Sequence, residues 1–380
     1  MIKMKKILFF IHDLGQGGAE KVLVNLVNHM DRNKFNITVI ALFGGGVNEQ
    51  FLDKDIRFKT IFPFEIPGNS KLLKFLSPQL LHRICIKDNF DIEVSYLEGP
   101  SARVISGCKS NHTKLICWIH VEQHTLKRLA GSFRNLKEAK KCYGKFSRII
   151  CVSKDVQKDF MRLLGNNSNC QILYNTIESE KIIELSKEKV TQFGRRDEIK
   201  LVAVGSLKPS KGYERLLRTI RKLKNENFPI HLYILGIGPL EHKIEEYIEN
   251  NNMKNTVTLL GYQTNPYKFV GKCDLFVCAS YAEGFSTATT EALILGVPVC
   301  TVKVSGMTEL LGENNEYGLV VENDEDSLYE GIKYLIKNPE ILMKYRSKAK
   351  ERGKRFFSEH TVTAVQDMLE NVERKKENGN

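Results

Sequence analysis

Two glutamates frame the stretch of this sequence that says most about its chemistry. Glu283 and Glu291 enclose residues 284–290, and the whole segment follows the strand-like run Leu275–Ala279 and predicts the start of a helix. The first amides of a helix carry partial positive charge and suit a phosphate. In a continuous helix the two carboxylates would lie roughly 12 Å apart, too far for one acid/base pair. The spacing instead suits two ends of one ligand.

A nucleotide sugar is the ligand that this pattern favours. Carboxylates accept hydrogen bonds from hydroxyl groups, so Glu291 is expected on the ribose and Glu283 on the transferred sugar, with the diphosphate at the helix start between them. The alternative interpretation is that both are ordinary solvated glutamates of a surface helix.

Three other loops between a strand and a helix are candidates for the same ligand. Gly15–Glu20 is rich in glycine, which lets backbone approach a phosphate, but it lacks the third glycine of the dinucleotide fingerprint. Lys211 lies in the loop Gly205–Glu214, where its ammonium group can meet phosphate oxygens. Gly236–Leu240 is a turn at the end of another run. Plain structural turns and a solvated lysine are the alternatives.

His120 follows the run Leu115–Ile119, which places an imidazole at the carboxyl end of a predicted strand. It can hydrogen-bond a sugar hydroxyl or stabilise charge in a transition state, with Glu122 as a nearby orienting carboxylate. A structural histidine is the alternative.

Short apolar runs alternate with helical patterns along the whole chain, which predicts an α/β protein. The runs are nearly continuous in hydrophobicity, as expected for strands covered on both faces in parallel sheets. Those expected as strands are Ile7–Ile11, Ile37–Leu42, Ile92–Leu97, Leu115–Ile119, Ile149–Val152, Leu201–Val204, Leu232–Leu235, Val257–Leu260, Leu275–Ala279 and Val297–Val302.

The 380 residues are too many for one ordinary core and predict two domains. Between Glu178 and Lys200 the chain becomes charged and loses strand character, so the junction is placed there. The predicted first domain is 1–185 and the second is 196–355. Three helices are expected near the end, from about Asp326, Pro339 and Ser358, with 356–380 forming a C-terminal helix.

Composition restricts the partners and the compartment. The net charge of +12 favours an anionic partner, and no apolar run is long enough to cross a bilayer. Aromatic platforms for stacked bases are not evident, so nucleic acid is not expected. The nine cysteines lack paired spacing, which indicates buried thiols in a reducing compartment and no zinc site. Asp53-Lys54-Asp55 follows a helix-like stretch and is interpreted as solvated surface.

Two segments of the first domain combine apolar and basic residues. Lys71–Lys87 mixes leucines and phenylalanine with lysine and arginine, and Lys127–Arg148 has Glu138 as its only acid. Such segments suit the surface of an anionic membrane. Ordinary surface helices are the alternative.

Together these motifs resemble glycosyltransferase family 4, a group of retaining sugar transferases with the GT-B fold that act in bacterial polysaccharide assembly. The resemblance rests on Gly17–Glu20, the His120 region, Val204–Gly212, Gly236–Pro239, and above all the Glu-x7-Glu segment followed by Gly296–Val299. It implies two Rossmann-like domains with parallel sheets that face a central cleft. The first would bind the acceptor and the second the nucleotide sugar, and the terminal helix would return to the first.

The resemblance also implies a role for individual residues. His120, Lys211 and Glu283 are expected to be catalytic: Lys211 on the diphosphate, Glu283 on the donor sugar and His120 near the reacting sugar. The remaining donor-binding residues implied are Gly17, Gly18, Ser206, Gly236, Gly284, Phe285, Ser286, Thr287 and Glu291. Many members of the family carry arginine where this chain has Ser206, so one of two cations on the diphosphate is missing, and Lys208 is a candidate substitute.

The implied reaction is transfer of a hexose or N-acetylhexosamine from a nucleotide diphosphate sugar, with uridine as the expected base, to a lipid-linked saccharide. No cofactor and no metal are expected. The product would be a capsular, exopolysaccharide or lipopolysaccharide unit, made in the cytoplasm at the inner face of the plasma membrane. Two alternatives remain, namely a nucleotide-sugar 2-epimerase of the same fold and a non-catalytic partner subunit of another glycosyltransferase.

Overall fold

The computed structural model describes residues 4–64, 73–165, 169–190, 193 and 197–372. The chain divides into two compact units. Unit 1 is made of Met1–Thr176 together with Ser358–Asn380, and unit 2 is Ile177–Phe357. Lys71 and Leu72 of the first basic segment and the tail 373–380 lie outside the described residues.

Unit 1 contains a seven-stranded sheet in the order β3-β2-β1-β4-β5-β6-β7, and all its strand pairs are parallel. The central strands are buried on both faces, which explains their unbroken apolar sequences. The strands are β1 (Lys5–Ile11), β2 (Phe35–Phe43), β3 (Arg57–Phe62), β4 (Ile92–Ser95), β5 (Lys114–Ile119), β6 (Arg148–Cys151) and β7 (Cys170–Ile172).

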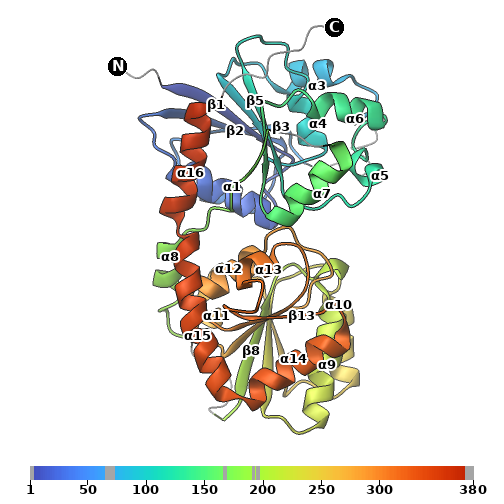
Figure 1. Ribbon diagram of the computed structural model, residues 1–380, viewed down its shortest axis with the longest axis vertical. Coiled ribbons are helices and arrows are strands. Elements are labelled where there is room, and N and C mark those ends of the chain that lie inside the picture. The colour runs from blue at the N-terminus through green and yellow to red at the C-terminus, as the bar shows by residue number, and fades with distance from the viewer. Residues whose placement is uncertain (1–3, 65–72, 166–168, 191–192, 194–196, 373–380) are drawn as a thin grey trace. The chain divides into compact units, whose positions relative to one another are not determined.

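Helices cover both faces of this sheet (Figure 1). Helices α1 and α16 pack together on one face, and α3, α4 and α6 pack on the other. The helices of unit 1 are α1 (Gly18–His29), α3 (Pro78–Cys85), α4 (Pro100–Ile105), α5 (Leu126–Leu129), α6 (Leu136–Tyr143), α7 (Lys154–Leu164) and α16 (Ser358–Asn371), with the short 3-10 helix η1 (Glu49–Phe51). Hydrogen bonds from Lys5 Nζ to the carbonyls of Leu369 and Glu370 attach α16 beside β1.

Unit 2 contains a six-stranded parallel sheet in the order β10-β9-β8-β11-β12-β13. Its strands are β8 (Ile199–Val204), β9 (Ile230–Leu235), β10 (Val257–Gly261), β11 (Leu275–Cys278), β12 (Val299–Val302) and β13 (Leu319–Val321). Its helices are α8 (Ser179–Leu185), α9 (Tyr213–Asn225), α10 (Glu241–Asn250), α11 (Tyr267–Val270), α12 (Thr287–Ile294), α13 (Met307–Leu311), α14 (Glu325–Lys337) and α15 (Pro339–Gly353), with 3-10 helices η2 (Pro209–Lys211) and η3 (Lys354–Phe356).

The helices of unit 2 also lie on both sides of their sheet. Helix α9 contacts α10 and α14, whereas α12 contacts α8 and α15, and Figure 1 shows these two groups on opposite faces. A core of leucine, isoleucine and valine side chains fills the space between the sheet and α9, α10 and α14. The sequence predicts this architecture of two α/β units, each with a parallel sheet covered by helices.

All ten runs predicted as strands are strands, and the three C-terminal helices begin at Glu325, Pro339 and Ser358. The division of the chain differs in detail from the predicted one. Helix α8, placed by the sequence in the first domain, belongs to unit 2. The C-terminal helix α16 belongs to unit 1, the domain to which the sequence assigns it.

Candidate functional site

The loops that follow β8, β9 and β11 hold most of the predicted site residues of unit 2. Because these strands are neighbours in a parallel sheet, their carboxyl ends lie at one edge, where open α/β sheets bind ligands. Lys211 is on the loop after β8, Gly236 on the loop after β9, and Glu283 on the loop after β11.

Lys211 and Glu283 form an ion pair at this edge. The ammonium nitrogen Nζ of Lys211 donates to Glu283 Oε1 at 2.6 Å, and the Ser280 hydroxyl donates to the same oxygen at 2.6 Å. Burial alone would lower the pKa of Lys211, but the charge of Glu283 outweighs burial and raises that pKa. Lys211 is therefore a charged group at neutral pH, and the Glu283 side chain, 10% exposed, is not a solvated surface glutamate.

A buried arginine fastens the two loops that carry this pair. Arg215, on α9, donates to the carbonyl oxygens of Ala279 at 2.7 Å and Ser280 at 2.8 Å, and its guanidinium group stacks on the Tyr281 ring. The chain turns before α9 at Gly212, where φ is +67° and a Cβ atom would lie 1.9 Å from the Ala279 oxygen. Only glycine fits there, so the spacing of Lys211 and Glu283 depends on this close approach.

Helix α12 begins just after Glu283 and supplies the amides that the sequence predicts for a phosphate. Ser286 is the N-cap, and its side chain accepts a hydrogen bond from the Thr289 amide. Helix geometry leaves the Thr287 and Ala288 amides without intrahelical partners. Behind this turn, Phe285 is buried against Phe356, so the backbone at 284–286 is held in place.

Glu291 lies within α12 and is 7% exposed. The hydroxyl of Tyr267, on α11, donates to Glu291 Oε1 at 3.3 Å. The structure thus excludes the interpretation of Glu291 as a solvated surface residue. It also shows that the segment is not one continuous helix, because Glu283 precedes the first helical residue Thr287.

The loops after β8 and β9 pack closely on each other. The Leu207 amide donates to the Ile237 carbonyl at 3.0 Å, and a Cβ on Gly236 would lie 2.0 Å from the Gly205 oxygen. Gly236 is therefore required by backbone packing. Ser206 lies within this pair of loops, whereas Lys208 is exposed.

The other predicted site residues belong to unit 1. Gly17 is the N-cap of α1, and a Cβ there would collide with the Glu20 carboxylate; Gly18 is the first helical residue. The glycine-rich loop is thus a helix N-terminus, as the sequence predicts.

His120 follows β5 and is 7% exposed. Burial lowers the pKa of His120 to about 4, so its ring is neutral above that pH. Its backbone amide donates to Glu98 Oε2 at 2.9 Å. The carboxylate that accepts a hydrogen bond from His120 is therefore that of Glu98. Glu122, which the sequence suggested for this role, lies instead in a group with His124 and Asp159.

Two groups of side chains in the described residues have atoms of the kind that bind metals. Glu122, His124 and Asp159 form one of them. His82, Glu93 and Cys108 form the other, in which His82 Nε2 lies 2.8 Å from Glu93 Oε2. Neither group includes a residue predicted to bind the donor. None of the nine cysteines, which all lie in the described residues, forms a disulfide.

Chemically, the edge of unit 2 combines a charged ammonium group, the start of a helix and a carboxylate. The first two favour an anion, and the third favours hydroxyl groups. Ser280 and Arg215, which hold this arrangement, and Glu98 were not predicted as site residues from the sequence.

Comparison with known proteins identifies the family. Residues 16–181 match the model described as Glycosyltransferase Family 4, and residues 186–355 match Glycosyl transferases group 1. A relative from Campylobacter jejuni is 31% identical over 364 residues, which cover 93% of this chain and 96% of the relative. The chain belongs to the group 1 glycosyltransferases.

The Campylobacter jejuni relative of this glycosyltransferase is named N-acetylgalactosamine-N,N'-diacetylbacillosaminyl-diphospho-undecaprenol 4-alpha-N-acetylgalactosaminyltransferase. A lipopolysaccharide core biosynthesis glycosyltransferase, LpsD of Rhizobium meliloti, is 20% identical over 93% of this chain and 94% of its own. The fold matches the crystal structure of Anabaena HepE in complex with UDP and glucose, with a TM-score of 0.78, 18% identity, and coverage of 97% of this chain and 100% of that one. The GT-B fold class predicted from the sequence is confirmed.

Proposed function

We propose that this glycosyltransferase moves a hexose or N-acetylhexosamine from a UDP-sugar to a saccharide acceptor, with retention of the anomeric configuration and without a metal ion. The observation that carries the proposal is the Lys211–Glu283 pair beside the N-terminus of α12. One ammonium group and the first amides of α12 suit a diphosphate, while Glu283 suits the hydroxyls of the attached sugar.

In this mechanism the departing nucleoside diphosphate is the group that must be stabilised. Lys211 and the amides near Ser286 and Thr287 offset the charge that develops on it, without a change in their own positions. Gly284 and Phe285 would contribute further backbone contacts to sugar and phosphate, and Glu291 would take the ribose. Ser206 supplies no charge, so Lys211 carries more of the stabilisation than in relatives with a second cation.

The roles of unit 1 in the proposal follow the resemblance of the sequence to its family. Gly17 and Gly18, at the start of α1, would approach the donor phosphates through their backbone. His120, neutral at physiological pH, would lie near the reacting sugar as a hydrogen-bonding group.

A lipid-linked acceptor in surface polysaccharide assembly is the substrate class that we propose. The name of the Campylobacter jejuni relative specifies a diphospho-undecaprenol acceptor, and that relative matches along almost its whole length. Relatives named for lipopolysaccharide core and capsular polysaccharide biosynthesis support the same kind of pathway.

We further propose that unit 1 meets the anionic inner face of the plasma membrane. No helix in the described part of the chain is long and apolar enough to cross a bilayer. Helix α6 and the segment before it expose a set of cations to solvent: Lys127, Arg128, Arg134, Lys137, Lys140 and Lys141. Each cation near an anionic surface contributes about 1 kcal/mol.

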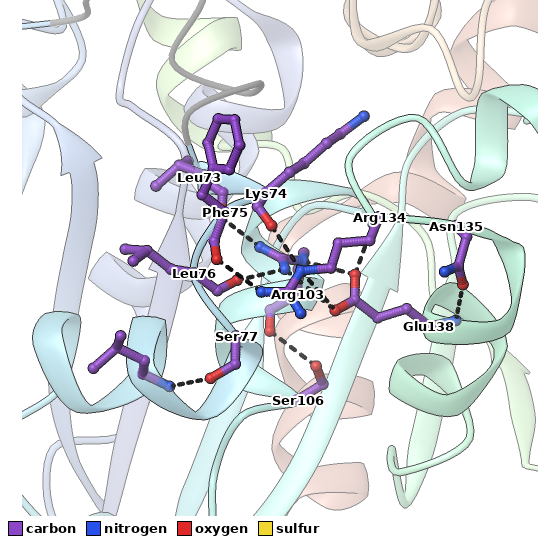
Figure 2. A network of polar contacts seen from close by, with 11 residues as sticks. Leu73, Lys74, Phe75, Leu76, Ser77, Arg103, Ser106, Arg134, Asn135 and Glu138 are labelled. Atoms are coloured by element: carbon purple, nitrogen blue, oxygen red, sulfur yellow. Dashed lines mark hydrogen bonds and ion pairs between the residues drawn. The ribbon is translucent and has the colours of Figure 1, made fainter.

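Figure 2 shows how the one acid of this segment is used. The carboxylate of Glu138 pairs with Arg103, which is 1% exposed, and accepts the Arg134 amide at 2.7 Å. Burial alone would raise the pKa of Glu138, but Arg103 and Arg134 lower it. Glu138 is thus committed to internal ion pairs, which leaves the surface of this segment basic.

The same two arginines hold in place the backbone that carries an exposed phenylalanine. Arg103 donates to the carbonyls of Leu73 and Leu76, and Arg134 donates to those of Lys74 and Phe75, all at 2.7–2.8 Å. The Phe75 side chain is 81% exposed. An exposed phenylalanine on a fixed backbone beside a basic surface suits contact with a lipid interface.

Product analysis tests the catalytic proposal. Thermal shift with a panel of nucleoside diphosphates and nucleotide sugars first identifies the donor, since a ligand at 100 times its Kd stabilises the folded state by about 2.7 kcal/mol. Proton NMR of the product formed from that donor, in buffer containing EDTA, then gives the anomeric configuration. Inversion, or loss of activity in EDTA that added Mg²⁺ restores, would contradict the proposed reaction.

Two other functions predict different outcomes. A 2-epimerase would convert the donor alone into a second nucleotide sugar without any acceptor. A non-catalytic subunit would bind the donor but neither transfer nor hydrolyse its sugar. The intact Lys211–Glu283 pair argues against the non-catalytic subunit, and incubation with donor alone distinguishes the epimerase.

Flotation with liposomes tests the membrane proposal. Binding to vesicles with anionic lipid should fall in high salt and in the triple variant Lys137→Gln, Lys140→Gln, Lys141→Gln. The matched control neutralises three cations of unit 2, Lys243, Lys254 and Lys348, and should bind as the wild type does. Equal binding to neutral and anionic vesicles would refute the proposal.

A further inference from the structure

A tyrosine hydroxyl contacts the glutamate that is proposed to take the ribose. Tyr267, on α11, donates to Oε1 of Glu291, on α12, and the two residues are nearly buried, at 6% and 7% exposed. An ionised carboxylate has no hydrogen to give, so the tyrosine is the donor. At 3.3 Å the bond is longer than the roughly 2.8 Å typical of a hydroxyl donor, so it orients the carboxylate and leaves it able to accept further hydrogen bonds.

The Tyr267 ring cannot move far, because apolar side chains surround it. It belongs to a buried cluster with Ile177, Ile182 and Ile294. Ile294 comes three residues after Glu291 on α12, so these two side chains lie on the same face of that helix. The ring therefore packs on the helix to which its hydroxyl is bonded, and this packing sets the position of the hydroxyl.

Asn265 fixes the backbone that carries the tyrosine. Its side-chain oxygen Oδ1 accepts the Tyr267 amide at 3.1 Å, and its nitrogen Nδ2 donates to the Leu185 carbonyl, at the end of α8, at 3.0 Å. Asn265 is 9% exposed, so both bonds are shielded from water. Helix α8 in turn contacts both α11 and α12 (Figure 1). The three helices together hold the Tyr267 hydroxyl against Glu291.

We propose that Tyr267 is a positioning residue for ribose recognition, which holds the Glu291 carboxylate in the direction that accepts the ribose hydroxyls. It thereby sets the preference of the donor site for ribonucleotides over 2′-deoxyribonucleotides. This inference rests on the proposed function, in which Glu291 takes the ribose. A glutamate side chain has several rotatable bonds, and a carboxylate that is already ordered loses less entropy when a ligand binds. Discrimination is strong when such a fixed polar group is left without its partner by the deoxy ligand.

Calorimetric titration with nucleoside diphosphates tests this role. The probes are UDP, CDP, ADP and GDP, each paired with its 2′-deoxy form, and inorganic pyrophosphate, which has no ribose. We expect the wild type to bind its preferred ribonucleotide about tenfold or more tightly than the 2′-deoxy form, because the deoxy form lacks a hydrogen bond to a charged group. Tyr267→Phe keeps the ring in its cluster and removes only the hydroxyl. This variant should reduce the preference to about threefold or less, with the affinity for pyrophosphate unchanged.

Tyr345→Phe is the matched control. It also removes a tyrosine hydroxyl of unit 2 that donates one hydrogen bond, at 3.0 Å, but the acceptor is the Asn315 carbonyl rather than a donor-site residue. This variant should keep the wild-type preference. Pyrophosphate separates positioning from a merely structural role, because general loosening of the site would weaken all the ligands together. Equal weakening of ribonucleotide, 2′-deoxyribonucleotide and pyrophosphate binding in Tyr267→Phe overturns the proposal.

The outcomes also separate this inference from the proposed function. A preference for the ribonucleotide that falls in Tyr267→Phe and persists in Tyr345→Phe supports the positioning role. A preference that Tyr267→Phe retains or increases, or that both variants lose, overturns the role but leaves the ribose assigned to Glu291. Equal binding of the ribo and 2′-deoxy forms by the wild type, or binding of no nucleotide at all, contradicts the assignment of Glu291 and overturns both.

Discussion

Lys211 and the Ser280 hydroxyl bind the same oxygen of Glu283, each at 2.6 Å. The lysine and glutamate thereby neutralise each other's charge, and the serine fixes the direction of the carboxylate. Because the fold fixes the pair, little reorganisation would be needed for the donor contacts proposed above.

Loss of the ammonium group should therefore affect the chemical step. We expect Lys211→Ala to lower kcat by about 10²-fold or more, by analogy with removal of one preorganised donor to a developing negative charge. Lys243→Ala, an exposed lysine of the same unit that pairs with Glu214, is the control and should leave kcat unchanged. Steady-state kinetics with the identified donor measures both, and an unchanged kcat in Lys211→Ala would refute the assigned role.

Removal of the arginine that fastens the two loops should destabilise unit 2. In Arg215→Met the carbonyls of Ala279 and Ser280 lose their donors in a buried setting, and we expect a loss of about 2–4 kcal/mol in the free energy of unfolding. The control is Arg218→Met, which breaks a partly exposed ion pair on the same helix and should cost under about 1 kcal/mol. Urea titration compares them, and equal losses would contradict the fastening role.

Substitution of Gly212 and of Gly261 separates the cost of a steric clash from the cost of an unfavourable backbone conformation. Both Gly212 and Gly261 have positive φ, +67° and +64°, but only at Gly212 would a Cβ collide with backbone, the Ala279 oxygen. Gly261→Ala should cost about 1 kcal/mol from conformation alone, and Gly212→Ala should cost clearly more. Thermal unfolding measures both, and equal costs would show that the loops adjust without strain.

The raised pKa of His82 predicts that the protein becomes less stable at alkaline pH. Burial alone would lower the pKa of His82, but Cys108 and Glu93 raise it to about 9. A raised pKa gives stability that is fully present below the unfolded value of about 6.5 and is lost as pH rises through about 9. The difference between these two pKa values corresponds to roughly 3 kcal/mol.

Urea unfolding at pH 6.5 and pH 9.5 measures this contribution. The wild type should lose more stability between the two pH values than His82→Gln does. His242→Gln, which changes an exposed histidine, should behave as the wild type. A similar loss in the wild type and His82→Gln would show that the pair with Glu93 does not contribute as argued.

Strands inside the sheets were predictable from the sequence, whereas three of the four edge strands were not. Nine of the ten predicted runs lie between two neighbouring strands; the tenth, Val257–Leu260, is at an edge but is still largely apolar. Strands β3, β7 and β13 were missed, and each is at the edge of its sheet with partly exposed side chains. Their short, mixed sequences carry little periodic signal.

Site residues in loops after strands were predictable from the sequence, whereas a buried residue on a helix was not. Glu283, Lys211 and His120 lie in loops directly after apolar runs, where position along the chain already indicates the binding edge. Glu98 lies one residue beyond the run Ile92–Leu97 and could have been found by the same rule as His120. Arg215 could not, because a cation in an amphipathic helix gives no sign of whether tertiary packing buries it.

Unit 1 is completed by a helix that comes from the far end of the chain. Helix α16 is bonded to Lys5 beside β1, yet the whole of unit 2 separates it in sequence from the other elements of unit 1. Unit 2 can therefore fold from one continuous segment, whereas unit 1 remains incomplete until α16 has been synthesised. A chain truncated before Ser358 would keep the whole of unit 2 but would expose the surface of unit 1 that α16 covers.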